Sequence, residues 1–314
     1  MKIPCYRKSC KGTYLKVEFK ILNNGHLEMK IHFQIILFNS HKDLAILLKS
    51  LDSLSIGTHK IYIHFIDHSE SDKEFNNVKN IIEKQENGKI ELFLEREKNC
   101  GFGQGHNNLY RKWKEEYEDC FILLNPDSIL HFDLIKNIDK YLNALKNENW
   151  GLLELAQFPS EHPKYYNPLS LETNWASGAG LIIRKKAFEK VGMFDENIFM
   201  YGEDVDLSIR MRIKDYKVLH LPEAKFTHLT KDTDVSRESE FTRIHKQASE
   251  LYLRYKFAKD RDVKKYMSLI GEIDPHYQEI LIKYNVMKKN LSGRTYYNKF
   301  VDKNQDYTNF RWSL

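Results

Sequence analysis

The chain has 314 residues, of which 41% are hydrophobic and 30% charged, a composition that excludes intrinsic disorder as the main state. This length fits two domains or one large α/β domain. The formal net charge of +5 is compatible with an anionic ligand or a membrane surface but too small to indicate nucleic-acid binding. No apolar run reaches the ~18 residues that span a bilayer, and the N-terminus lacks a signal-peptide core, so we expect a cytoplasmic protein.

Short apolar strands alternate with amphipathic helices from residue 31 onward. The predicted strands are 32–38, 60–66, 89–94, 121–124, 152–156 and 179–183, and the predicted helices are 43–54, 73–84, 107–117 and 132–145. This alternation predicts an α/β fold with a mostly parallel sheet and helices on both faces. Ligands bind such sheets at the carboxyl ends of the strands. Residues 1–30 form a hairpin or an irregular extension.

The pattern becomes helical after residue 232. Apolar residues in 241–258 recur at spacings of three and four, which predicts one long helix with a narrow apolar stripe. This stripe either packs on the sheet domain or forms the seam of a homodimer. A further helix is expected from Asp274 onward. The segment 294–314 mixes aromatic and basic residues, so it covers the fold, binds a partner or contacts a membrane interface.

An asparagine and an aspartate, Asn125 and Asp127, directly follow the predicted strand 121–124. Side chains two residues apart point the same way in an extended chain. Their oxygens suit a hard divalent cation that holds a diphosphate. The alternative is a simple turn, because Asn, Pro and Asp are all turn residues.

Three carboxylates, Glu203, Asp204 and Asp206, stand where an amphipathic helix begins. Acidic residues favour helix N-termini, so the cluster is explained either by capping or by function. Because clustered carboxylates repel one another, one that faces a cleft is a natural general base.

The glycine-rich stretch 99–107 does not match a dinucleotide-binding fingerprint, since His106 stands where the third glycine belongs. This mismatch argues against a nicotinamide-dependent oxidoreductase. The stretch indicates either a close approach of the backbone to a ligand or only a turn. No Gly-x-Ser-x-Gly motif is present, so nothing indicates a serine nucleophile elbow. A lone histidine, His228, follows a short predicted strand at 224–227.

Taken in order, these segments resemble glycosyltransferase family 2, the inverting enzymes of the GT-A fold. The closest likeness is to rhamnosyltransferase-like bacterial members that build surface polysaccharides such as capsule or lipopolysaccharide. The segments that carry the resemblance are 36–39, 65–69, 99–107, 124–127, 178–180, 192–196, 199–207 and His228. It implies an N-terminal extension at 1–30, a GT-A catalytic domain at 31–232 and a helical C-terminal region at 233–314.

The resemblance also implies roles for individual residues. Asp204, with Glu203 beside it, would be the catalytic base. Asp127, with Asn125 in place of the family's usual first aspartate, and His228 would bind Mg²⁺ or Mn²⁺. The implied donor-binding residues are Asn39, Asp67, Ser69, Asn99, Gly101, Phe102, Gly103, Gly105, Asn107 and Asn125. The implied acceptor-side residues are Trp175, Gly178, Ala179 and Tyr201.

The implied activity is transfer of one sugar, with inversion, from a nucleotide-diphosphate donor to a saccharide or lipid-linked saccharide acceptor. A dTDP-rhamnose-like or UDP-linked donor is expected. The alternative is a catalytically silent protein on the same fold that binds nucleotide sugars or acts as a scaffold. We expect the protein in the cytoplasm, with peripheral contact to the inner face of the cytoplasmic membrane.

Overall fold

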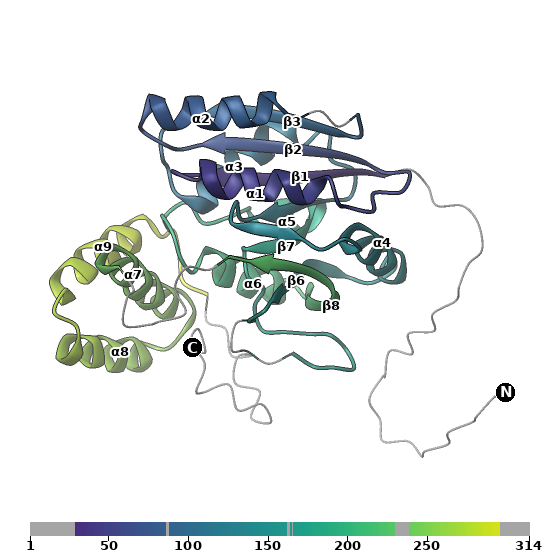
Figure 1. Cartoon of the computed structure of the whole chain (residues 1–314). Helices are drawn as coiled ribbons and strands as arrows, with labels where there is room; N and C mark the ends of the chain where they lie inside the picture. The colour runs from purple at the N-terminus through teal and green to yellow at the C-terminus, as the bar shows by residue number, and fades with distance from the viewer. Residues whose placement is uncertain (1–28, 86–87, 162–163, 165, 230–238, 296–314) are drawn as a thin grey trace, which may run out of the picture.

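The computed structural model describes residues 29–85, 88–161, 164, 166–229 and 239–295 (Figure 1). The hairpin predicted in 1–30 and the aromatic, basic segment therefore lie almost wholly outside the described residues. Within them, the chain builds one sheet with helices packed on it and a group of helices beside it.

The sheet has eight strands in the order β3-β2-β1-β4-β7-β6-β8-β5. The strands are β1 Lys30–Leu37, β2 Lys60–Asp67, β3 Ile90–Arg96, β4 Cys120–Leu124, β5 Ser128–Leu130, β6 Trp150–Phe158, β7 Gly180–Arg184 and β8 Lys217–His228. The first four strands in this order pair in parallel, and β8 pairs in parallel with β6. Antiparallel pairing joins β7 to both β4 and β6, and β5 to β8. The expected mostly parallel sheet is confirmed, with β5 and β7 running against the rest.

Helices cover both faces of the sheet, as predicted. They are α1 His41–Leu51, α2 Asp72–Glu83, α3 Phe102–Trp113, α4 Leu134–Ala144, α5 Lys185–Val191, α6 Glu203–Ile213, α7 Glu240–Phe257, α8 Asp260–Ile273 and α9 Tyr277–Asn290. One apolar core lies between the sheet and α1, α2 and α4. A second core lies between the sheet and α3, α5 and α6. The sheet has an apolar core on each face because successive side chains of a strand point to opposite faces.

The glycine-rich stretch is a helix start rather than a loop, which corrects the predicted boundary at residue 107. Gly101 precedes α3 with φ 92°, a conformation that glycine adopts without strain. A Cβ on Gly103 would lie 3.0 Å from Phe194, and one on Gly105 would lie 2.8 Å from His68. These two glycines therefore allow α3 to pack closely against its neighbours.

The predicted long C-terminal helix is α7, and its stripe is buried inside the chain. Ile244, Ala248 and Leu251 pack in a core shared with α6, α8 and α9 (Figure 1). These buried residues are therefore unavailable to a second copy. A homodimer through 241–258 stays a prediction that depends on the exposed face of α7, where Phe241 is 52% exposed. None of the helices in the described ranges combines the length and the apolar character that crossing a bilayer requires.

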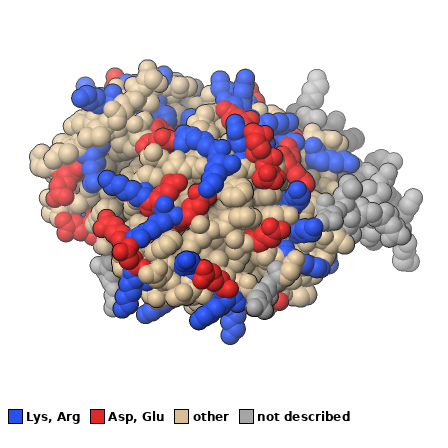
Figure 2. Space-filling view, turned by 90° about the horizontal axis from the view of Figure 1, so that it is seen from above, with Lys and Arg blue, Asp and Glu red and all other residues tan. Residues whose placement is uncertain are grey.

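The distribution of charge on the surface agrees with the small net charge of +5. On the face seen in Figure 2, the described Lys and Arg residues are interspersed with Asp and Glu residues rather than gathered in one basic field. A protein that binds nucleic acid through its phosphates presents a basic patch or stripe instead.

Candidate active site

A cavity of about 560 Å³ opens where β4, β7, β8 and the start of α6 meet. Its lining comes from segments far apart in the sequence: Phe102, Asn125, Trp175, Ser177, Gly178, Ala179, Met200, Tyr201, Gly202, Glu203, Asp204, His228 and Lys246. Nine of the predicted site residues are among them. The structure thus gathers the implied base, the acceptor-side residues and two of the implied metal-binding residues, Asn125 and His228, around one cleft.

The carboxylate of Asp204 is fixed at the N-terminus of α6. Gly202 precedes the helix with φ 91° and turns the chain into it. The Oδ2 atom of Asp204 accepts a hydrogen bond of 2.9 Å from the backbone N–H of Gly178, and its Oδ1 accepts one of 2.8 Å from that of Val205. The implied base is therefore tied to the segment that holds the implied acceptor-side residues Gly178 and Ala179.

The two neighbouring carboxyls of this cleft, Glu203 and Asp204, differ in their hydrogen bonding. Burial, together with the charge of Asp204, raises the pKa of Glu203 to about 8. Burial also raises the pKa of Asp204, but its two backbone N–H donors oppose this rise. Two backbone N–H groups bind the Asp204 carboxylate, whereas the buried Oε2 of Glu203 has no hydrogen-bond partner among the described residues, so Asp204 is the carboxyl better able to carry the negative charge.

A polar group at the end of β8 can hold a cation. The Nε2 atom of His228 lies 3.2 Å from Oδ1 of Asp127 and 3.3 Å from Nδ2 of Asn125. Its Nδ1 lies 3.0 Å from Oε1 of Gln157, which can accept a hydrogen bond from the ring N–H at Nδ1 and leave the Nε2 lone pair toward Asp127. Imidazole nitrogen and carboxylate oxygen together fit a divalent metal. Sequence reasoning missed Gln157, whose register beside β8 emerges only from strand pairing.

A buried ionic network lies behind the acceptor wall and was also missed. Glu154 on β6 accepts a hydrogen bond of 2.8 Å from the N–H of Ser177, contacts Lys164 and lies 3.0 Å from Nδ1 of His220. Burial opposes ionisation, but Lys164 and His220 outweigh it and lower the pKa of Glu154 to about 2. Lys164 also donates to the carbonyl of Trp175 over 2.9 Å. The only signal in the sequence was a carboxylate inside an apolar strand.

The predicted donor residues form a second group at the ends of β1 and β2. The Oδ1 atom of Asp67 accepts from the N–H and hydroxyl of Ser69, over 2.9 and 2.6 Å. The Ser69 hydroxyl oxygen accepts from the N–H of Asn39 over 2.8 Å. The buried Oδ2 of Asp67 has no hydrogen-bond partner among the described residues.

Other predicted donor residues have local roles and do not line the cleft. Asn99 accepts a hydrogen bond of 3.0 Å from the N–H of Gly101, which shapes the entry to α3. The buried amide of Asn107 donates to the carbonyl of Phe194 and accepts from its N–H, each over 3.0 Å. Asn107 thus fastens the loop after α5 to α3.

Comparison with known proteins gives the same family likeness. No family model matches the chain. It is 24% identical over 188 residues to rhamnosyltransferase WbbL of Escherichia coli, covering 49% of this chain and 71% of that protein. It is 40% identical over 70 residues to N-acetylglucosaminyl-diphospho-decaprenol L-rhamnosyltransferase of Mycobacterium tuberculosis, covering 22% of this chain and 20% of that one. Half or more of the chain therefore lies outside each of these matches.

Two solved structures share the fold. Mannosyltransferase PcManGT of Pyrobaculum calidifontis, in complex with GDP-Man and Mn²⁺, has a TM-score of 0.55 at 11% identity and covers 85% of this chain and 77% of its own. GalNAc-T7 with UDP, GalNAc and Mn²⁺ has a TM-score of 0.60 at 12% identity, with 85% and 55% covered. These likenesses confirm the predicted GT-A fold.

Proposed function

We propose that this chain, a glycosyltransferase similar to the rhamnosyltransferases, moves one sugar from a nucleotide-diphosphate donor to a saccharide acceptor with inversion at the anomeric carbon. The observation that carries the proposal is the single cleft shared by Asp204 and the Asn125–His228 pair. The candidate base and the candidate cation site thus face one volume in which donor and acceptor can meet.

Asp204 would act as the base. Its carboxylate takes the proton of an acceptor hydroxyl as the hydroxyl oxygen attacks the anomeric carbon. The bond from that carbon to the diphosphate breaks, and its electron pair leaves with the nucleoside diphosphate. A single displacement from the opposite face inverts the centre. A positioned base of this kind contributes about 10²–10⁴-fold to the rate.

Asp127, Asn125 and His228 would hold a divalent cation at the donor. Such an ion, when bound, stabilises the negative charge that develops on the leaving diphosphate. Gln157 would keep the His228 ring oriented through the 3.0 Å contact at Nδ1. Mn²⁺ in both solved neighbours supports a divalent cation here.

The proposed donor is a dTDP-rhamnose-like or UDP-linked sugar, and the proposed pathway is surface-polysaccharide assembly. The names of the relatives support a rhamnosyl donor, and one of them is named for a diphospho-decaprenol-linked sugar. On the acceptor side, α7 places the ammonium of Lys246 5.1 Å from the ring centre of Tyr201. A cation at this wall suits the diphosphate of a lipid-linked saccharide, presented at the inner membrane face.

Thermal unfolding with UDP, dTDP, GDP and CMP, each with and without Mn²⁺, tests the proposed donor site. A ligand at about 100 times its Kd stabilises by about 2.7 kcal/mol, which is visible as a higher Tm. We expect one nucleoside diphosphate to raise the Tm only with the metal. Absence of any shift would contradict a nucleotide-sugar site. Binding without sugar transfer would favour the catalytically silent alternative.

A further inference from the structure

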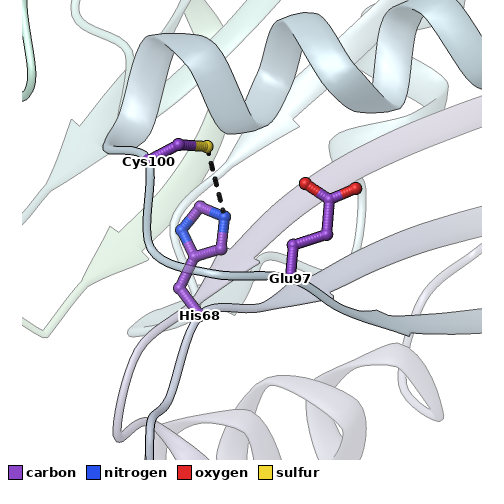
Figure 3. Close-up of side chains that lie close together, drawn as sticks. All are labelled: His68, Glu97 and Cys100. Atoms are coloured by element: carbon purple, nitrogen blue, oxygen red, sulfur yellow. Dashed lines mark hydrogen bonds between the residues drawn. The ribbon is translucent and has the colours of Figure 1, made fainter.

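Three potential metal ligands converge beside the predicted donor residues but belong to none of the groups above. His68 follows β2, Glu97 follows β3, and Cys100 precedes α3 (Figure 3). One ligand atom of each lies within 4.8 Å of the other two. The Sγ atom of Cys100 is 3.8 Å from Nε2 of His68. Two separate loops of the chain therefore bring a sulfur, a nitrogen and an oxygen close together.

The chemistry of this donor set selects zinc among common divalent ions. Thiolate, imidazole and carboxylate are the three zinc ligands found in proteins, at about 2.3, 2.0 and 2.1 Å. In a tetrahedral site these bond lengths separate sulfur from nitrogen by about 3.5 Å. The observed 3.8 Å needs only a small adjustment. Thiolate and carboxylate together would also balance the charge of the ion.

The surroundings hold these groups in place. A Cβ on Gly105 would lie only 2.8 Å from Cε1 of His68, so glycine at this position lets the imidazole lie against α3. The side chain of Asn108 donates to Oε2 of Glu97 over 2.8 Å and lies 3.9 Å from Sγ of Cys100. His68 is buried, whereas Glu97 and Cys100 are half-buried, which leaves an ion a route from solvent.

A second group of candidate ligands offers a contrast. Glu240, His276 and Glu279 also lie within 4.8 Å of one another, but both glutamates are exposed and the group has no thiol. Surface carboxylates beside a histidine are ordinary ion pairs, and this group serves as a control.

We propose that His68, Glu97 and Cys100 bind one Zn²⁺ ion, with water as the fourth ligand, and that the ion fastens the loop after β2 to the loop between β3 and α3. This site shares no residue with Asp127 and His228. Its occupancy can therefore be measured without the proposed donor cation and without any assay of transferase activity.

Cobalt(II) titration of the reduced full-length protein tests the proposal, because a thiolate bound to Co²⁺ gives a charge-transfer absorption that oxygen ligands do not. We expect one equivalent of Co²⁺ to produce this band and Zn²⁺ to abolish it by displacement. Cys100→Ser should remove the band, and His68→Gln should weaken Co²⁺ binding at least tenfold. Asp127→Ala, His276→Ala and the double variant Cys5→Ser/Cys10→Ser should retain the band.

Thermal unfolding in chelator checks that Cys100→Ser still folds, with a Tm near that of the wild type. If that variant does not fold, Glu97→Gln serves in its place, and we expect it to bind Co²⁺ at least tenfold more weakly. Zn²⁺ should raise the Tm of the wild type and not that of Cys100→Ser. Absence of the charge-transfer band in the wild type, or its persistence in Cys100→Ser, would overturn the proposal.

Discussion

The two halves of the sheet build their polar groups in different ways. In the parallel half, β3-β2-β1-β4, the groups stand at strand ends or on the loops that follow, as Asp67 does as the last residue of β2 and Ser69 two residues later. In the other half, a strand carboxylate, Glu154, and a helix-start carboxylate, Asp204, bind the same short segment at Ser177 and Gly178. The first kind of group follows from local chain order, whereas the second depends on long-range packing.

The two halves of the sheet should also respond differently to substitution. A loop residue such as Asp127, which is partly exposed, can be replaced with little effect on folding. A buried charge such as Glu154 has ionic partners whose own charges would be left unbalanced. Substitutions at the proposed donor-binding residues of the parallel half should therefore weaken ligand binding. Substitutions at Glu154 or Asp204 in the other half, on the proposed acceptor side, should lower both turnover and stability.

The largest expected effect is at the base. Asp204→Asn keeps the size of the side chain but removes the proton acceptor, so we expect turnover to fall about 10²–10⁴-fold. Donor binding, measured by calorimetry with Mn²⁺, should stay within about threefold of the wild type. Asp133→Asn, at an exposed position before α4, is the matched control and should keep full activity. A near-wild-type rate in Asp204→Asn would remove Asp204 from the mechanism.

The second effect tests the buried network behind the acceptor wall. Glu154→Gln leaves Lys164 without its buried counter-charge, and breaking a buried pair in this way costs about 3 kcal/mol or more in the free energy of unfolding. Urea denaturation measures this loss. Glu161→Gln is the control, because Glu161 faces the same His220 at 3.4 Å but is 43% exposed. Equal stability of the two variants would show that the network does not hold the wall.

The third effect concerns the cation site of the donor half. Asp127→Ala removes the carboxylate that lies 3.2 Å from His228, so we expect metal-dependent donor binding to weaken at least about tenfold. The melting curve without ligand should stay close to that of the wild type. An unchanged Mn²⁺ titration of donor binding would place the cation elsewhere.

The smallest effect is a pH dependence of stability. The pKa of Glu203 is about 8 in the folded protein and 4.5 ordinarily, so the folded chain holds a proton that the unfolded chain loses between these values. Stability from this group is therefore lost as pH rises from about 4.5 to 8. Glu203→Gln cannot ionise, and its Tm advantage over the wild type should grow by a few degrees across that window. A pH-independent difference would contradict the shifted pKa.

Much of the fold was predictable because its signals are local. The strand–helix alternation of residues 32–145 and the helix that follows Asp274 needed only apolar spacing and turn residues, and the structure confirms them. Strand direction was not predictable: β7 is an apolar run like any parallel strand, yet it pairs antiparallel with both neighbours. Periodicity carries no information on direction. The start of α3 was misplaced because Gly103 and Gly105 disfavour helix locally, whereas tertiary packing requires them there.

For the site, as for the fold, local signals allowed prediction and long-range contacts did not. Motif order indicated His228 and Asp204, which the structure brings to one cleft, and Asp127, which contacts His228 beside it. It gave no sign of Gln157 or of Glu154, since each acts through a partner on a strand distant in sequence. Their contribution stems from strand register, which only the folded sheet defines.

The anomeric configuration of the transferred sugar tests the central claim most directly. The wild-type protein would be incubated with Mn²⁺, a saccharide acceptor linked to a lipid diphosphate, and the nucleotide sugar whose nucleoside diphosphate raises the Tm most. NMR of the product then reports the new glycosidic bond. We expect a transferred sugar of inverted configuration from the wild type and none from Asp204→Asn. A product that retains the donor configuration, or bound donor with no transfer, would contradict it.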